Sequence, residues 1–286
     1  MNIEAVKTIG VIGAGQMGRG IAQVASQVGY QVYLFDVSQE HLDKAITFIH
    51  EQLDKGAAKG KWREADAQVS KKNLIPVTKM SALAQVDLVI EAATENINLK
   101  KEIFKQLDTT IKAEAILATN TSSISITEIA AVTKRPDRVV GMHFMNPVPV
   151  MKLVEGIRGL ETSEETFVTV EKLAQKMGKI FVAVKDYPGF AVNRILMPMI
   201  NEAIFTLYEG VASIQDIDQA MKLGTNQPMG PLELADFIGL DTCLAIMEVL
   251  HRGLGDDKYR PCPLLKQYIA AGRFGRKVKR GFYEYP

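Results

Sequence analysis

Along the first 185 residues, short apolar runs rich in β-branched residues alternate with longer stretches in which apolar residues recur every three to four positions. The short runs predict buried strands, and the longer stretches predict amphipathic helices. Strands are expected at Thr8–Ile12, Gln31–Phe35, Asp87–Ala92, Ile116–Thr119, Arg138–His143, Met151–Ile157 and Ile180–Val184. Helices are expected at Met17–Val28, about Gln39–Lys59, Leu99–Thr110, Ile126–Val132 and Glu164–Met177. This alternation is typical of an α/β domain with a mostly parallel sheet.

The pattern changes after residue 185, where the segment Lys185-Asp186-Tyr187-Pro188-Gly189 collects turn and helix-breaking residues. Beyond it, apolar residues recur at helical spacing, first at Leu196, Ile200, Ala203 and Leu207 and then over Ile238–Leu250. We therefore expect an α/β domain at residues 1–185 followed by an all-helical domain at residues 186–286. Pro198 lies inside the first of these helices and is expected to kink it.

Composition narrows the possible partners. The chain has 286 residues, of which 47% are hydrophobic, and this is enough to bury two cores. A formal net charge of +1 gives no overall basic field, so nucleic acid is not an expected partner and charged ligands must bind in local pockets. No signal-peptide pattern and no run of eighteen apolar residues occurs in the sequence. A cytoplasmic protein that does not bind membranes is therefore expected.

Metal and disulfide chemistry is not indicated. Cys243 and Cys262 have no CxxC spacing and no cluster of histidines nearby, so two free, buried thiols are expected. Three of the four histidines, at His41, His50 and His251, lie in polar or glycine-rich surroundings that are typical of surface positions. We expect no metal site.

A glycine-rich segment follows the first predicted strand and leads into the first predicted helix. The segment reads Gly13-Ala14-Gly15-Gln16-Met17-Gly18. In this context the first glycine permits a tight turn, the second lets backbone approach a pyrophosphate, and the third lets helix and strand pack closely. The pyrophosphate would lie at the N-terminus of the helix, where unpaired N–H groups and the helix dipole favour an anion. The first domain is therefore expected to be Rossmann-like and to bind a dinucleotide.

Asp36 indicates which dinucleotide is bound. It ends the second predicted strand about twenty residues after the glycines, where such domains place an acid that accepts hydrogen bonds from the adenosine ribose. A 2′-phosphate at the same place would meet the negative charge of this acid. NAD is therefore favoured over NADP, with a purely structural strand-ending aspartate as the alternative.

Polar groups near the ends of later strands are candidates for chemistry, because ligands of an open α/β sheet bind at the carboxyl ends of its strands. They are Asn120-Thr121-Ser122-Ser123, His143 with the following Phe144-Met145-Asn146-Pro147, and Glu155 within its strand. A neutral imidazole suits the removal of a hydroxyl proton because its pKa lies near the working pH. A carboxylate on the second ring nitrogen would orient the ring and stabilise the imidazolium. We expect His143 to be the base and Glu155 its partner, since an unpaired acid in so apolar a strand would be costly.

From Lys7 to Tyr285 the chain resembles the short-chain L-3-hydroxyacyl-CoA dehydrogenases, in particular the bacterial 3-hydroxybutyryl-CoA dehydrogenases. The resemblance rests on Asn120-Thr121-Ser122-Ser123, the run from Gly141 to Glu155, Asp186-Tyr187-Pro188-Gly189-Phe190 with Asn193-Arg194, and Gly230-Pro231. It implies NAD-dependent interconversion of 3-hydroxyacyl-CoA and 3-ketoacyl-CoA in fatty-acid or butanoate metabolism. It also implies that the helical domain contributes to the substrate cleft and to a homodimer, which agrees with the amount of apolar helix in so small a domain.

The resemblance assigns further roles by position. Ser122 and Asn193 would contact the reacting oxygen of the substrate, and Lys59 would meet the phosphates of CoA, with a solvated lysine as the alternative. The residues implied to lie around the cofactor are Glu95, Lys100, Ser122, Asn146 and Lys277. The length of the acyl chain stays open, because apolar pockets discriminate by only about 1–3 kcal/mol per methylene.

Two positions depart from the pattern of the family. A glycine, Gly156, follows the acid where a β-branched residue is usual, and it is expected to loosen Glu155. Before the final Gly-Phe-Tyr, the family has Lys-Thr/Ser-Gly where this chain has Lys277-Val278-Lys279.

Two rival functions would leave different residues in the sequence. A related hydroxyacid or sugar-acid dehydrogenase would use a central lysine, and a non-catalytic nucleotide-binding protein would not need the four groups Ser122, His143, Glu155 and Asn193 together.

Overall fold

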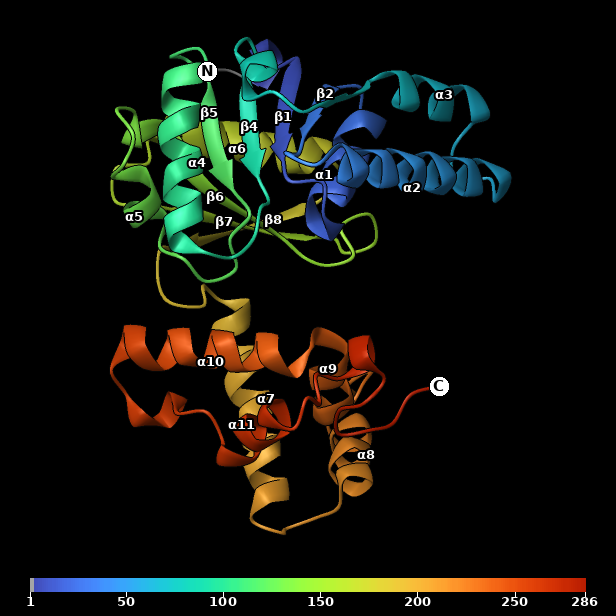
Figure 1. Cartoon of the computed structure of the whole chain (residues 1–286), viewed down its shortest axis with the longest axis vertical. Coiled ribbons are helices and arrows are strands. Elements are labelled where there is room, and N and C mark those ends of the chain that lie inside the picture. Colours follow the sequence, from blue (N-terminus) through green and yellow to red (C-terminus); the bar gives the residue numbers. More distant parts are fainter. Residues whose placement is uncertain (1–2) are drawn as a thin grey trace. The chain divides into compact units, whose positions relative to one another are not determined.

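The computed structural model describes residues 3–286, which divide into two compact units (Figure 1). Unit 1 ends at Tyr187 and unit 2 spans Pro188–Pro286. Within the described part of the chain, no helix is long and apolar enough to cross a membrane. Each unit has its own hydrophobic core, and each is described by itself below.

Unit 1 is built on an eight-stranded sheet with the order β3-β2-β1-β4-β5-β6-β7-β8. The strands are β1 (Thr8–Ile12), β2 (Gln31–Phe35), β3 (Leu74–Val77), β4 (Leu88–Glu91), β5 (Ile116–Thr119), β6 (Val139–Phe144), β7 (Leu153–Arg158) and β8 (Ile180–Lys185). All neighbouring strands are parallel except β6 and β7, which are antiparallel. The expected mostly parallel, Rossmann-like sheet is confirmed.

Helices cover the sheet. They are α1 (Gln16–Gln27), α2 (Gln39–Ala58), α3 (Glu64–Lys72), α4 (Ile97–Thr110), α5 (Ile126–Ala130) and α6 (Glu164–Lys176). Apolar residues of α1, α2 and α6 form one continuous core with alternate residues of the strands, among them Val140, Met142 and Phe144 of β6. Because successive side chains of a strand point to opposite faces, His143 points to the other face of the sheet.

One α-helix and one strand of unit 1 were not predicted. Helix α3 is strongly polar and buries only Ala67 and Ser70, so it lacks the apolar stripe by which a helix is found in a sequence. Strand β3 is four residues long and contains Pro76, which has no N–H to give to a ladder. Such a strand is tolerated at the edge of a sheet, and β3 is indeed the edge strand beside β2.

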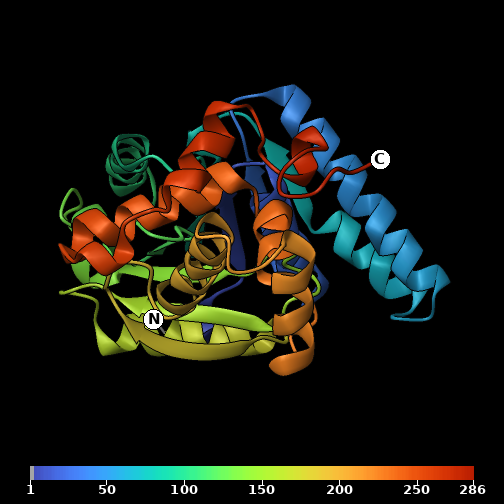
Figure 2. The same cartoon turned by 90° about the horizontal axis from the view of Figure 1, so that it is seen from below.

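Helices α2 and α3 form a pair that extends beyond the sheet. Figures 1 and 2 both show them side by side at one end of unit 1, with the sharp turn between them farthest from the strands. Trp62 lies in this turn and donates a hydrogen bond from its indole N–H to the carbonyl oxygen of Leu53, at 2.9 Å. A side chain at Gly56 would collide with the Trp62 ring, with a Cβ only 1.9 Å from it, so the turn packs tightly against α2.

Unit 2 is helical, as expected. Its helices are α7 (Val192–Tyr208), α8 (Ile214–Gly224), α9 (Pro231–Ile238), α10 (Leu240–Leu254) and α11 (Pro263–Ala270). Helix α7 continues through Pro198. Cys243 and Cys262 are free and buried in the core of the unit, as the sequence indicated.

Two motifs of unit 2 have structural explanations. The carboxylate of Asp218 accepts hydrogen bonds from the N–H groups of Leu232 and Glu233, at 2.8 and 2.9 Å, and so caps α9. A Cβ at Gly230 would lie 2.3 Å from the Asp218 side chain, which explains the glycine before Pro231. The buried Asp236 likewise accepts hydrogen bonds from the backbone of Phe282 and Tyr283, and this fixes the C-terminal segment.

Candidate active site

The glycine loop connects β1 to α1. Gly13 has a φ of +97°, a value that L side chains rarely adopt, and a Cβ there would lie 2.8 Å from the carbonyl oxygen of Ala92. A Cβ at Gly18 would lie 1.8 Å from the carbonyl oxygen of Gly13, so helix and loop are in direct contact. Gly15 is the N-cap of α1 and has no side chain to cap it. The first turn of α1 therefore keeps N–H groups that suit an anion such as a pyrophosphate.

Asp36 follows β2 and lies beside this loop. Its carboxylate accepts hydrogen bonds from the backbone N–H groups of Ala14 and Ser38, both at 2.9 Å. These bonds fix the carboxylate next to the glycine loop and leave it further acceptor positions, because a carboxylate accepts about four hydrogen bonds. The arrangement fits the adenosine half of a dinucleotide, and the contact of Asp36 with a ribose stays a prediction.

From this geometry we expect kcat/KM for NADH to exceed that for NADPH by at least about tenfold, because the Asp36 carboxylate would face the 2′-phosphate. Asp36→Ala should lower the NADH efficiency through loss of its hydrogen bonds, but it should also narrow the ratio between the two cofactors. Initial rates with each cofactor measure this ratio, and Asp43→Ala on α2 is a matched control. Equal efficiency of the wild-type protein with both cofactors would contradict the prediction.

His143 and Glu155 are brought together by the antiparallel pairing of β6 and β7. They are direct partners in the register of the two strands, so their side chains lie on the same face of the sheet. The imidazole Nδ1 lies 2.8 Å from a carboxylate oxygen of Glu155, and the two residues are 7% and 1% exposed. A buried carboxylate at this distance fixes the orientation of the ring.

Gly156 does not leave a gap beside Glu155. A Cβ at this position would lie 1.8 Å from the Phe181 ring, so this ring fills the space that a β-branched side chain would take. The Phe181 ring in turn packs edge-on against Phe167 of α6, with 5.3 Å between the ring centroids. The expectation of a loosened Glu155 is therefore not met in the structure.

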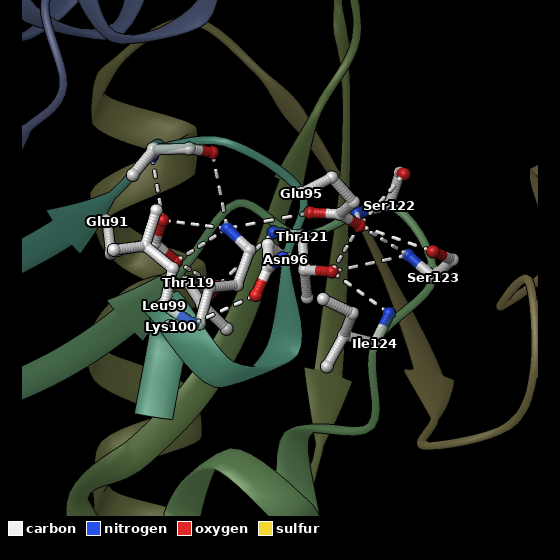
Figure 3. Close-up of polar contacts among 11 residues, drawn as sticks. Glu91, Glu95, Asn96, Leu99, Lys100, Thr119, Thr121, Ser122, Ser123 and Ile124 are labelled. Atoms are coloured by element: carbon white, nitrogen blue, oxygen red, sulfur yellow. Dashed lines mark hydrogen bonds and ion pairs between the residues drawn. The ribbon is translucent and has the colours of Figure 1, made fainter. Parts of the chain in front are cut away.

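Ser122 lies in the loop after β5, and Glu95 organises this loop (Figure 3). One oxygen of the Glu95 carboxylate accepts hydrogen bonds from the hydroxyl of Thr121 at 2.6 Å, the N–H of Ser122 at 2.8 Å and the N–H of Ser123 at 3.2 Å. The hydroxyls of Ser122 and Ser123 lie within 3.1 and 3.2 Å of the same oxygen. Asn120 holds the start of the loop, since its side-chain oxygen accepts from the N–H of Phe144, next to His143.

Lys100 is 1% exposed and contacts two acids. Its Nζ donates to Glu91 at 2.7 and 2.9 Å and lies 3.5 Å from the second oxygen of Glu95. Glu91 ends β4, is fully buried, and was missed in the sequence analysis. The signal was available, because Glu91 is an acid inside an apolar run, which is the reasoning that singled out Glu155.

Three of the expected site residues line one pocket of unit 1, with a volume of about 370 Å³. They are Gln16 at the start of α1, Lys59 at the end of α2, and Asn146 after β6. Three further basic side chains line this pocket, namely Arg19, Lys55 and Lys61. Among the described residues around it there is no carboxylate. Such a pocket favours a polyanionic ligand.

Two expected site residues, Asn193 and Lys277, belong to unit 2. Asn193 lies in the first turn of α7 and is 7% exposed. The Nζ of Lys277 is paired with the carboxylate of Asp241, with 2.6 Å to one of its oxygens. Lys279, which stands at the family's glycine position, has a φ of +62°, so the backbone keeps the conformation that favours glycine.

Asp186 is a further residue whose role the sequence did not reveal. Its carboxylate accepts hydrogen bonds from the hydroxyl of Ser125 and from the N–H groups of Ile126 and Thr127, at 2.7 to 3.0 Å. Asp186 thereby fixes the start of α5, directly after the Ser122 loop. Within residues 3–286, no group of three or more histidine, cysteine, aspartate or glutamate side chains is placed to hold a metal ion.

Comparison with known proteins identifies the family. A family model described as 3-hydroxyacyl-CoA dehydrogenase, NAD binding domain, matches residues 8–187, and the model of the C-terminal domain of the same family matches residues 189–285. The chain is 59% identical to a probable 3-hydroxybutyryl-CoA dehydrogenase of Bacillus subtilis, covering 98% of both chains. It is 45% identical to the human mitochondrial hydroxyacyl-coenzyme A dehydrogenase, covering 98% of this chain and 91% of that protein.

A solved structure agrees with this result. The crystal structure of (S)-3-hydroxybutyryl-CoA dehydrogenase from Ralstonia eutropha is similar to this chain with a TM-score of 0.96 and 51% sequence identity. The alignment covers 99% of this chain and 100% of the other. The resemblance noted in the sequence and the expected NAD-binding domain are both confirmed. The chain belongs to the 3-hydroxyacyl-CoA dehydrogenase family and is an NAD-dependent oxidoreductase.

Proposed function

We propose that the protein interconverts (S)-3-hydroxybutyryl-CoA and acetoacetyl-CoA, and related short 3-hydroxyacyl-CoA and 3-ketoacyl-CoA pairs, with NAD and NADH. The relatives named above carry these substrates in their names. The observation that carries the proposal is the buried contact of 2.8 Å between His143 and Glu155. A base oriented by a buried acid, in a domain that fits a dinucleotide, suits the oxidation of a secondary alcohol.

In the proposed mechanism, Glu155 holds Nδ1 of His143, so Nε2 is the nitrogen that exchanges a proton with the substrate oxygen. In the oxidative direction, Nε2 takes the proton of the 3-hydroxyl group. Bound NAD supplies the acceptor for the hydride that leaves C3. The Glu155 carboxylate stabilises the imidazolium formed in this step, and in the reductive direction the imidazolium returns its proton to the 3-keto oxygen.

Ser122 and Asn193 are proposed to hydrogen-bond the same substrate oxygen. Ser122 suits this role because its loop is held through the backbone: Glu95 accepts from the N–H of Ser122, and the Thr121 hydroxyl accepts from the N–H of Ser123. Around the cofactor, we propose the glycine loop from Gly13 to Gly18 for the pyrophosphate and Asp36 for the ribose. Glu95, Lys100, Asn146 and Lys277 are proposed to lie near the nicotinamide half.

The experiment that tests this function is a rate profile of the purified protein with NADH and 3-ketoacyl-CoA substrates of increasing acyl length, followed by the loss of NADH absorbance. Acetoacetyl-CoA and its near homologues should be reduced to the (S)-alcohols. The reverse reaction should consume (S)-3-hydroxybutyryl-CoA but not its (R) enantiomer. No turnover with any 3-ketoacyl-CoA would overturn the proposal and favour the non-catalytic alternative.

The basic pocket is proposed to bind the nucleotide part of CoA, with Lys59 contacting a phosphate. Lys59→Ala is then expected to raise KM for acetoacetyl-CoA about three- to tenfold with little change in kcat, because one phosphate contact is lost. The effect should shrink with added salt, which screens exposed charges. The N-acetylcysteamine thioester of acetoacetate lacks the nucleotide, so its KM should not change.

Lys172→Ala is a matched control, since Lys172 is an exposed lysine on α6 outside the pocket. If Lys59→Ala raised KM equally for the CoA ester and for the truncated thioester, the phosphate contact would be excluded. If it changed neither KM, Lys59 would be a solvated surface lysine.

Unit 2 is proposed to form a homodimer through its helices. It exposes several large apolar side chains, namely Ile195, Tyr208, Val211, Leu223 and Phe237. A dimer interface formed by these side chains would remove them from water. Sedimentation equilibrium of the full chain should give twice the monomer mass, and a monomer at micromolar concentration would contradict the assignment. The cytoplasmic location and the substrate cleft at residues 186–286 stay predictions.

A further inference from the structure

A buried ion pair lies behind the Ser122 loop, and one of its two members, Glu91, has no role in the proposed function. Glu91 and Lys100 are 0% and 1% exposed, and their charged groups are 2.7 Å apart. The Glu91 carboxylate also accepts hydrogen bonds from the hydroxyl of Thr119 at 2.7 Å and from the N–H of Ala93 at 2.7 Å. Thr119 is the register partner of Glu91 on the neighbouring strand β5, so the sheet itself fixes this carboxylate.

Stability alone is a poor explanation for such a pair. Removing two charges from water costs several kcal/mol per ion, and their attraction often does no more than offset that cost. Apolar residues of the same volume would commonly serve the fold equally well. A buried pair with full hydrogen bonding does, however, fix the position of its charges closely.

The fixed position of the Lys100 ammonium matters because this group faces Glu95, the acid that holds the Ser122 loop. Its Nζ lies 3.5 Å from one oxygen of Glu95, while the other oxygen of Glu95 accepts the bonds from residues 121–123. Figure 3 shows this chain of contacts running from Glu91 through Lys100 and Glu95 to Ser122. Burial opposes ionisation of Glu95, but the Lys100 ammonium and the bonds from Thr121 and Ser122 outweigh it and lower the pKa of this carboxyl.

We propose that Glu91 is a positioning residue, which fixes the Lys100 ammonium so that its contact orients the Glu95 carboxylate, which in turn holds the loop that presents Ser122. The catalytic meaning of this arrangement rests on the proposed function, whereas the ordering of the loop does not. Without the ammonium, the Glu95 carboxylate, whose side chain is 37% exposed, would lose the contact that holds its second oxygen. Its hold on the N–H groups of Ser122 and Ser123 would then weaken.

The test uses Glu91→Gln/Lys100→Met, which removes both charges together and leaves no unpaired buried ion. Hydrogen exchange read by mass spectrometry reports the N–H groups of residues 122–124, which bond to Glu95 or to the Thr121 hydroxyl. Exchange in this segment is expected to accelerate at least about tenfold, while β1 and α1 keep their wild-type rates. Unchanged exchange at 122–124 in the folded variant would overturn the proposal.

A matched control removes another ion pair of the same helix. Arg135 and Asp108 are 2.8 Å apart and are largely buried, and Asp108 lies about 12 Å further along α4 than Lys100. Asp108→Asn/Arg135→Met should lower the melting temperature yet leave exchange at residues 122–124 unchanged. Equal acceleration in both double variants would mean that general loss of stability is the cause, and this too would overturn the proposal.

A milder variant keeps the test decisive if the first double variant does not fold. Thr119→Val has the same shape but removes the hydroxyl, which donates to Glu91 and also accepts a hydrogen bond from the N–H of Thr121 at 3.3 Å. It should accelerate exchange at residues 122–124 about threefold, and no acceleration would overturn the proposal.

The kinetic arm compares kcat/KM for acetoacetyl-CoA, which should fall at least about tenfold in Glu91→Gln/Lys100→Met and less than about twofold in the control pair. Should the wild-type protein reduce no 3-ketoacyl-CoA, only the kinetic arm would be lost, and the exchange arm would still decide the positioning role.

Discussion

Replacing His143 by glutamine is expected to lower kcat by about 10² to 10⁴, which is the usual contribution of a positioned general acid or base. Glutamine keeps a hydrogen-bonding group near Glu155 but cannot exchange a proton with the substrate at neutral pH. The measurement is kcat for acetoacetyl-CoA reduction at saturating NADH. The Kd for NADH, followed by its fluorescence, should change little, because the glycine loop and Asp36 are untouched.

His251→Gln is the matched control for this substitution. His251 lies on α10 in unit 2, partly exposed and 3.2 Å from the carboxylate of Asp257. This variant should keep wild-type kcat. If His143→Gln kept near-full turnover at saturating NADH, His143 would not be the base, and the proposed mechanism would have to be abandoned.

Replacing Glu155 by glutamine is expected to lower kcat by at least about tenfold and at most about 10⁴-fold, the loss that follows when the orienting acid of a Ser-His-Asp triad is replaced by its amide. Glutamine retains a hydrogen bond but not the charge that stabilises an imidazolium. The measurement is kcat for acetoacetyl-CoA reduction at saturating NADH.

Glu161→Gln is the control, because Glu161 is an exposed acid in the turn after β7. It should leave kcat unchanged. If Glu155→Gln behaved in the same way, Glu155 would be only a buried strand charge, and its contact with His143 would have no part in the reaction.

Much of unit 1 could be predicted because each signal has a local cause. The runs Thr8–Ile12, Gln31–Phe35 and Ile116–Thr119 form strands with the predicted bounds. The glycine loop could be read from the sequence because only glycine fits the φ of Gly13 and the contact at Gly18. These requirements depend on a few neighbouring residues, so they can be recognised in a single sequence.

What could not be predicted depends on pairings between distant segments. The pairing of His143 with Glu155 was expected, but the antiparallel register of β6 and β7 that produces it was not, because neither strand reveals the direction of its partner. The contact of Phe181 with Gly156 crosses from β8 to β7 and explains a departure that had suggested a loose acid. Glu91 could have been singled out as an acid in an apolar run, but its contact with Lys100, which reaches back from α4, could not.

The measurement that tests the central claim most directly is a double-mutant cycle in kcat with His143→Gln, Glu155→Gln and the variant that carries both. If Glu155 acts only through His143, the double variant should lose about as much activity as His143→Gln alone, because residues that act as one unit are strongly non-additive. We therefore predict a kcat within about threefold of that of His143→Gln. A loss equal to the product of the two single losses would contradict the account, because it would mean that the two side chains act independently.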